Sequence, residues 1–172
     1  MLAKGLKRCL NVGQAVPGMK LIVINGNTGK FEVEQGVDAQ AFFKDRKVAL
    51  VGFPGAFTPT CQSTHLPEYI ERAAAFKAKG VSIVGVGVND FFIMKMFAEH
   101  LGGDIAYIAD GSGTFTKALD AGVDLSEPGL GYRTRRFSAL VDNGKITVVN
   151  DEGGPGMTEL SAAETMLKAL GN

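Results

Sequence analysis

The sequence predicts a single α/β domain, and two patterns carry this prediction. In the first, residues 48–53 and 81–88 are short apolar runs typical of strands buried on both faces, with an apolar helical stripe between them. In the second, two apolar runs flank Asn143-Gly144, a strong hairpin signal, and a helix follows. The 172 residues suit one domain with a real core.

The residues before the first buried strand predict smaller elements. Residues 21–24 predict a strand, and residues 25–29, rich in Gly and Asn, predict a turn. Residues 31–34 alternate between apolar and acidic side chains, so we expect them to pair back as a hairpin. Residues 39–44 predict one or two helical turns.

The helix after the first buried strand should end near Lys79, because Gly80 is a typical helix stop. A strand, a helix and a strand then follow one another, so strands 48–53 and 81–88 should be parallel with a right-handed crossover. The apolar stripe of this helix consists of Leu66, Tyr69, Ile70, Ala73 and Phe76.

The second half of the chain predicts a helix at 91–101, capped by Asn89-Asp90. Ser161 and Glu164 have the spacing of a capping box before the last helix. The remaining expected elements are a short strand at 105–108, a short helix at 114–119, a Gly- and Pro-rich loop to about residue 132, and hairpin strands at 137–141 and 145–149.

Composition excludes several classes of function. The 18 basic and 18 acidic residues give no net charge and no basic stripe, which argues against a nucleic-acid partner. No apolar run is long enough to span a membrane. Two cysteines and two histidines without ligand spacing indicate neither a metal site nor a cofactor site. Few cysteines and no signal-peptide pattern favour a reducing compartment such as the cytoplasm.

The most informative stretch is residues 53–67, which continues directly from the first buried strand. Within it, Cys61 lies where a stiff, proline-containing loop opens into a helix. Backbone N–H groups and the helix dipole favour an anion at such a place, so a thiol there should ionise more readily. Pro67 cannot donate to Ser63, so the helix should either kink there or follow a short separate turn.

Ionisation alone does not make a fast nucleophile. It raises the thiolate fraction of an ordinary thiol at pH 7 by at most about 30-fold, so hydrogen-bond donors aimed at the moving charge are also needed. The hydroxyl of Thr58 could reach either the thiolate or a bound oxygen, and Pro54 can wall the pocket against water. No Lys or Arg lies between Lys47 and Arg72, so a cation must come from a distant segment.

The pattern Pro54-x-x-x-Thr58-x-x-Cys61 resembles the active-site signature of peroxiredoxins. The longer run Pro-Gly-Ala-Phe-Thr-Pro-x-Cys-x-x-x-His-Leu-Pro resembles that of their type 5, or type II, subfamily. The resemblance implies a single-domain thioredoxin-like fold with insertions before its βαβ half and between its two halves. It also implies a thiol-dependent peroxidase for hydrogen peroxide and small alkyl hydroperoxides, in which a thiolate becomes a sulfenic acid.

The resemblance also assigns roles to residues. Cys61 corresponds to the peroxidatic cysteine, Thr58 to the residue that binds thiolate and peroxide, and Pro54 to the residue that shields the site. Arg136, in the run Arg-Arg-Phe-Ser, matches the family's active-site arginine and would supply the missing cation. Its neighbour Arg135 is the alternative.

His65 lies one helical turn after Cys61, so the two side chains can share a helix face. The family has a histidine there, and we expect it to pack or form hydrogen bonds rather than act as a general base. Without the motif, Cys61 itself would be interpreted as an inert small apolar residue, the usual state of a lone cysteine.

The resolving cysteine of many family members is absent from its two usual places. Residues 156–159, before the last helix, contain no cysteine, and neither do residues 84–87. This indicates a one-cysteine mechanism in which an external thiol reduces Cys61. Glutathione with glutaredoxin, or a thioredoxin-like protein, are the reductants that the family suggests. Cys9 is the alternative resolver.

Residues 1–11 form an N-terminal extension that precedes the peroxiredoxin domain, which we expect at 12–172. Leu2, Leu6, Cys9 and Leu10 share a helical stripe, and no acidic residue occurs before Glu32. The extension therefore has two interpretations: a flexible basic tail, or the remnant of a mitochondrial transit peptide, which would make the location mitochondrial.

Two other classes of function remain open from the sequence. The first is a non-enzymatic thiol redox sensor or interaction module on the same fold, although such a protein does not need Thr58 and Arg136. The second is a cysteine hydrolase that uses Cys61 and His65, for which the sequence offers no third orienting group. The family further implies a homodimer.

Overall fold

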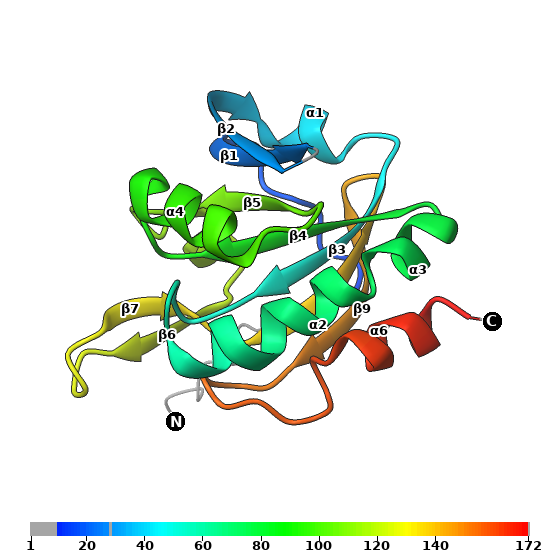
Figure 1. Ribbon diagram of the computed structural model, residues 1–172. Coiled ribbons are helices and arrows are strands. Elements are labelled where there is room, and N and C mark those ends of the chain that lie inside the picture. The colour runs from blue at the N-terminus through cyan, green and yellow to red at the C-terminus, as the bar shows by residue number, and fades with distance from the viewer. Residues whose placement is uncertain (1–9, 28, 172) are drawn as a thin grey trace, which may run out of the picture.

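The computed structural model describes residues 10–27 and 29–171 and contains a mixed sheet with helices on both faces (Figure 1). The strands are β1 (Lys20–Asn27), β2 (Lys30–Asp38), β3 (Lys47–Gly52), β4 (Val81–Gly87), β5 (Ala106–Ala109), β6 (Gly122–Leu125), β7 (Gly131–Thr134), β8 (Phe137–Asp142) and β9 (Lys145–Asp151). The helices are α1 (Ala39–Phe43), the π-helix η1 (Cys61–His65), α2 (Leu66–Glu71), α3 (Ala73–Ala78), α4 (Phe91–Leu101), α5 (Thr114–Ala118) and α6 (Ala163–Ala169).

The main sheet has the strand order β2-β1-β5-β4-β3-β8-β9. β4 pairs in parallel with β3 and with β5, and the other neighbours are antiparallel. The predicted βαβ unit and the hairpin at Asn143-Gly144 are both confirmed. Together they form the two halves of a thioredoxin-like fold, with β1, β2 and α1 placed before the first half. The elements from α4 to β7 lie between the halves.

β3 is buried on both faces, as its sequence predicts. Ala49 and Val51 face a core that α2, α3, α4 and α6 cover, whereas Val48 and Leu50 face a second core beneath α1 and α5. Figure 1 shows α2 and α3 running across the sheet in front of β3, with α6 beside them. The central strand therefore fixes the position of whatever follows Gly52.

Two local predictions were wrong. The expected loop between residues 120 and 132 contains a two-stranded sheet of β6 and β7, which projects from the body in Figure 1. The expected capping box at Ser161 and Glu164 does not form. Glu164 pairs instead with Lys168, and the N–H of Ala163 donates to Glu68 Oε1 of α2 at 3.0 Å.

Other expectations hold in detail. Asp90 caps α4, because its Oδ1 accepts a hydrogen bond from Ile93 N at 3.0 Å. The helix that begins near Cys61 reaches Ala78 as predicted, but it breaks at Arg72, where φ is −99° and ψ is 8°. Among residues 10–27 and 29–171, no helix has the length and apolar character needed to cross a bilayer.

The N-terminal extension lies mostly outside the described residues. Cys9, Leu2 and Leu6, which carry its predicted stripe, belong to that part of the chain. Leu10 and Val16 are described, and both are buried in the core beneath α1 and α5.

Candidate active site

The loop that carries the motif leaves the centre of the sheet, where β3 ends between β4 and β8. Gly52 is necessary at this exit, because a Cβ there would lie 2.1 Å from the ring of Phe137. Pro54 and Gly55 are buried in the loop. Asn89, after β4, fixes the loop by accepting a hydrogen bond from Ala56 N at 2.9 Å. The motif is thus anchored to the central strands of the sheet.

The helix that contains Cys61 opens with a π-turn. The N–H of Leu66 donates to the carbonyl of Cys61, five residues earlier, instead of four. Pro67 accounts for this, because it has no N–H to donate to Ser63 and its ring crowds a regular turn. The π-turn leads directly into α2, and it leaves both Cys61 and His65 buried.

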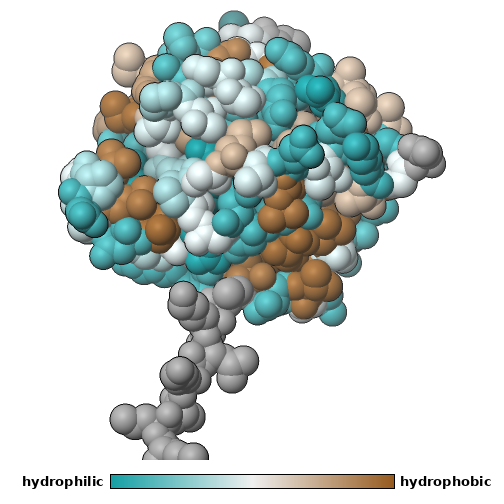
Figure 2. Space-filling view, turned by 90° about the horizontal axis from the view of Figure 1, so that it is seen from below, coloured by the Kyte–Doolittle hydropathy of each residue, from teal (hydrophilic) through white to brown (hydrophobic). Residues whose placement is uncertain are grey.

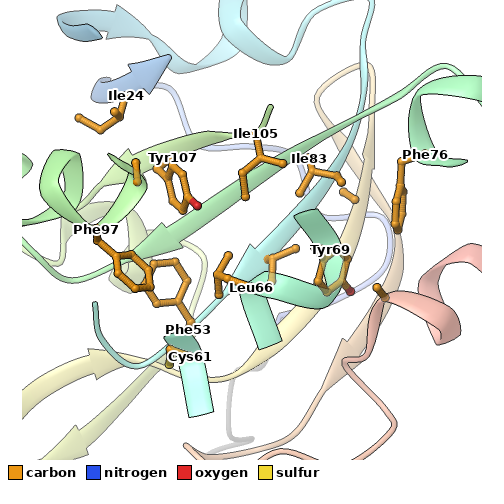
Figure 3. Close-up of a cluster of buried hydrophobic side chains, with 14 of the residues drawn as sticks. Ile24, Phe53, Cys61, Leu66, Tyr69, Phe76, Ile83, Phe97, Ile105 and Tyr107 are labelled. Carbon is orange, nitrogen blue, oxygen red and sulfur yellow. The ribbon is translucent and has the colours of Figure 1, made fainter. Parts of the chain in front are cut away.

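Cys61 lies at one end of the apolar core between the sheet and α2 (Figure 3). Its side chain is 0% exposed and faces Arg136, which is 2% exposed. Arg136 Nη2 donates to Cys61 Sγ at 3.3 Å, and Nη1 lies 2.9 Å from His65 Nδ1. Nε donates to the carbonyl of Pro155 at 3.0 Å. Every nitrogen of this guanidinium therefore has a partner in or beside the site.

Arg135 points elsewhere, because successive residues of an extended chain face opposite sides. Its Nη2 lies 2.8 Å from Asp151 Oδ2, and Nη1 donates to the carbonyl of Gly122. Of the two candidate arginines, the structure brings Arg136 to Cys61.

His65 is neutral in this environment. Burial, and secondarily the charge of Arg136, lower the pKa of His65 from 6.5 to about 3. Its Nε2 lies 3.3 Å from the carbonyl of Ser161, which can only accept, so Nε2 carries the proton and Nδ1 accepts from Arg136. The ring therefore orients Arg136 and has no free lone pair for Cys61, which removes the basis for a cysteine hydrolase.

Thr58 is partly exposed, and its Oγ1 donates to the carbonyl of Gly55 at 2.8 Å. The same oxygen keeps lone pairs for another donor. Sequence reasoning missed the contributions of Pro155 and Ser161. Both act through main-chain carbonyls, which leave no residue-type signal in the sequence.

Comparisons with known proteins agree with this geometry. The Redoxin family matches residues 12–167. Peroxiredoxin-2C of Oryza sativa subsp. japonica is 48% identical over 152 residues, which cover 85% of this chain and 93% of the rice protein. The chain belongs to the peroxiredoxin family. Other matched relatives are named as chloroplastic and mitochondrial peroxiredoxins.

Solved peroxiredoxins have the same fold. Reduced Prx3 of Vibrio vulnificus in complex with hydrogen peroxide superimposes with a TM-score of 0.80 at 41% identity, covering 93% of this chain and 95% of that one. The antioxidant protein of Plasmodium falciparum, described as a 1-Cys peroxiredoxin, gives a TM-score of 0.81 at 28% identity, covering 93% and 98%.

As a type II peroxiredoxin, the chain is an oxidoreductase that reduces a peroxide at the expense of a thiol. Family membership thus decides between the enzyme and the non-enzymatic sensor that the sequence left open. The roles of individual residues rest on the geometry of the site.

Proposed function

We propose that Cys61 is the peroxidatic cysteine of a one-cysteine peroxidase for hydrogen peroxide and small alkyl hydroperoxides. The observation that carries this proposal is the hydrogen bond of 3.3 Å from Arg136 Nη2 to Cys61 Sγ, made between two buried side chains. A buried cation that donates to sulfur favours the thiolate, which is the nucleophilic form.

The reaction begins when the thiolate of Cys61 attacks one peroxide oxygen. A sulfur–oxygen bond forms while the O–O bond breaks, and the leaving oxygen takes a proton to become water or an alcohol. Thr58 Oγ1 can accept a hydrogen bond from the peroxide O–H, since its own proton is donated to Gly55. The guanidinium of Arg136 is placed to stabilise the charge that moves from sulfur to oxygen.

Pro54 has a shielding role in this proposal. It is buried at the end of β3, and it brings no N–H that would attract water. Excluding water strengthens the interaction between Arg136 and the reacting charge.

The product on Cys61 is a sulfenic acid, and an external thiol reduces it. The first thiol attacks the sulfenic sulfur, releasing water and leaving a mixed disulfide, and a second thiol then frees Cys61. Glutathione with glutaredoxin, or a thioredoxin-like protein, would supply these thiols. The similarity to a 1-Cys peroxiredoxin of Plasmodium falciparum supports this reading. Resolution by Cys9 is the competing route.

Intact mass under non-reducing conditions tests the proposal. After about one equivalent of hydrogen peroxide, we expect Cys61 to gain one oxygen without any crosslink. Cys61→Ser should gain none, and Cys9→Ser should behave as wild type. A disulfide between Cys61 and Cys9 would contradict the one-cysteine mechanism, and a Cys61→Ser protein with full peroxidase activity would contradict the role of Cys61.

We further propose that the enzyme forms a homodimer through an apolar patch beside the site. The patch consists of Phe57, Phe92, Ile93 and Met96, which are 41%, 69%, 38% and 60% exposed. Phe57 directly precedes Thr58, and its ring packs against Phe97 and His100 of α4. Figure 2 illustrates how apolar groups interrupt the polar surface on one face of the molecule. Contiguous exposed apolar surface commonly marks an interface.

Charges introduced into this patch should dissociate the dimer. We expect Phe92→Glu with Met96→Glu to elute as a monomer in size-exclusion chromatography with light scattering, because burying unpaired like charges in an interface is costly. Val12→Glu alters an equally exposed apolar residue outside the patch and should leave the dimer intact. A wild-type protein that is monomeric at all concentrations would contradict the proposal.

The remaining assignments are also proposals. We take residues 12–172 as the peroxiredoxin domain and residues 1–11 as an extension. A cytoplasmic location fits the thiol chemistry, and the basic extension makes a mitochondrial one the alternative. Imaging of the full chain and of a variant without residues 2–9, which keeps the buried Leu10, distinguishes the two locations.

A further inference from the structure

One carboxylate holds the segment between β9 and α6 in place. Glu152 Oε1 accepts hydrogen bonds from Thr158 N at 2.9 Å, from Ser161 N at 3.0 Å and from Ser161 Oγ at 2.8 Å. Its Oε2 accepts from Thr158 Oγ1 at 2.7 Å. Burial alone would raise the pKa of Glu152, but these bonds outweigh burial and lower the pKa from 4.5. The carboxylate is therefore charged at neutral pH.

The segment that Glu152 holds presents two main-chain carbonyls to the active site. The carbonyl of Ser161 accepts from Tyr69 Oη at 2.8 Å and lies 3.3 Å from His65 Nε2. The carbonyl of Pro155 accepts from Arg136 Nε at 3.0 Å. The carbonyl of Ser161 fixes the proton of His65 on Nε2, and the carbonyl of Pro155 fixes the plane of the Arg136 guanidinium.

The main chain links the same segment to Arg136. The N–H of Arg136 donates to the carbonyl of Gly154 at 2.9 Å, and the N–H of Glu152 donates to the carbonyl of Arg136 at 3.0 Å. Within residues 10–27 and 29–171, the carboxylate of Glu152 makes no ion pair with a Lys or Arg side chain. Its charge acts on the N–H and O–H groups of one segment, and it also works to raise the pKa of His65, against the larger effect of burial. The segment supports Arg136, which contacts Cys61, and His65, which contacts Arg136.

We propose that Glu152 is a positioning residue for the peroxidase reaction, because it holds the carbonyls of Pro155 and Ser161 where they fix Arg136 against Cys61 and His65 against Arg136. This inference rests on the proposed role of Cys61. The inference gives a function to the segment before α6, which stood out in the sequence only because residues 156–159 contain no resolving cysteine. Loss of the carboxylate releases Thr158 and Ser161 and allows both carbonyls to shift together.

The test compares Glu152→Ala, Glu152→Gln and the matched control Glu159→Ala, which removes an exposed carboxylate from the same segment. We expect Glu152→Ala to lower the second-order rate constant for hydrogen peroxide by about 10- to 100-fold, the usual cost of misplacing a reacting group. Glu152→Gln retains an oxygen that can accept from Thr158 N and Ser161 N, so it should recover most of the rate. Glu159→Ala should match wild type.

The pH profile of Cys61 alkylation by iodoacetamide separates positioning from general loosening. Displacement of Arg136 should move the midpoint of the profile to higher pH in Glu152→Ala. Loosening alone would speed alkylation at every pH without moving the midpoint. If Glu152→Ala does not fold, Ser161→Ala with Thr158→Val removes both hydroxyl donors and keeps both carbonyls, and it should give a smaller shift in the same direction.

Three results would overturn the inference. The first is a folded Glu152→Ala protein with the wild-type rate constant for hydrogen peroxide and the wild-type alkylation profile. The second is a Ser161→Ala, Thr158→Val protein in which the midpoint of the alkylation profile does not move. The third is a Glu152→Gln protein that reacts as slowly as Glu152→Ala. The last would show that charge rather than position matters. Failure of the proposed function would instead appear in wild type, as absence of peroxide reduction, and the alkylation profiles would still report on the positioning.

Discussion

Replacing Arg136 by Met should lower the second-order rate constant for oxidation of Cys61 by hydrogen peroxide by about 10²- to 10³-fold. This is the usual cost of removing one donor aimed at charge that develops in a transition state. Arg136 Nη2 is the donor to Cys61 Sγ, and the side chain is 2% exposed, so water cannot readily take its place. Met fills a comparable volume, which limits the cost in stability.

Arg136→Lys should recover part of the loss, because Lys restores the charge but not the planar fork. In the structure that fork reaches Cys61, His65 and Pro155 at once. The matched control is Arg135→Met. Arg135 pairs with Asp151, so this variant should lose stability and keep the peroxide rate constant. The chain has no Trp, so quenched flow with intact mass is a suitable measurement. Equal rate constants for wild type and Arg136→Met would remove Arg136 from the mechanism.

The sequence predicts those site residues that lie close together along the chain. Pro54 and Thr58 lie in the loop before Cys61, so one continuous motif contains all three residues and carries the family resemblance that assigns them. Arg136 is 75 residues beyond Cys61, and no local pattern separates it from Arg135. The family resemblance selected Arg136, and the alternation of an extended chain provides the physical reason. Pro155 and Ser161 left no signal, because they act through main-chain carbonyls. Glu152 left none because its carboxylate reaches the site only through that segment.

The fold shows the same division between local and distant causes. β3 and β4 were predictable because each is an apolar run buried on both faces. The capping box failed because two distant carboxylates intervene: Glu152 binds the hydroxyl of Ser161, and Glu68 takes the N–H of Ala163. The strands β6 and β7 were missed because each has only four residues, most of them half-buried, so they lack the apolar pattern of a buried strand.

Acidification from pH 7 to pH 5 should destabilise the protein by about 2 kcal/mol through His65 alone. The pKa of His65 is about 3 in the folded protein and 6.5 when unperturbed. Between these values the unfolded chain binds one more proton than the native protein, so stability falls as pH falls, by about 1.36 kcal/mol per pH unit. Glu152, with its lowered pKa, loses its stabilisation mainly below its unperturbed value of 4.5, outside this interval.

Urea unfolding at pH 7 and pH 5 measures the effect. His65→Asn keeps an acceptor for Arg136 and cannot gain a proton, so its stability should change much less over this interval. His100 is the second histidine of the chain and is exposed, so His100→Asn should retain the wild-type pH dependence. If His65→Asn and wild type lost equal stability, His65 would have to be protonated in the folded protein. Its Nδ1 could then no longer accept from Arg136, and the orientation of the guanidinium at Cys61 would need another cause.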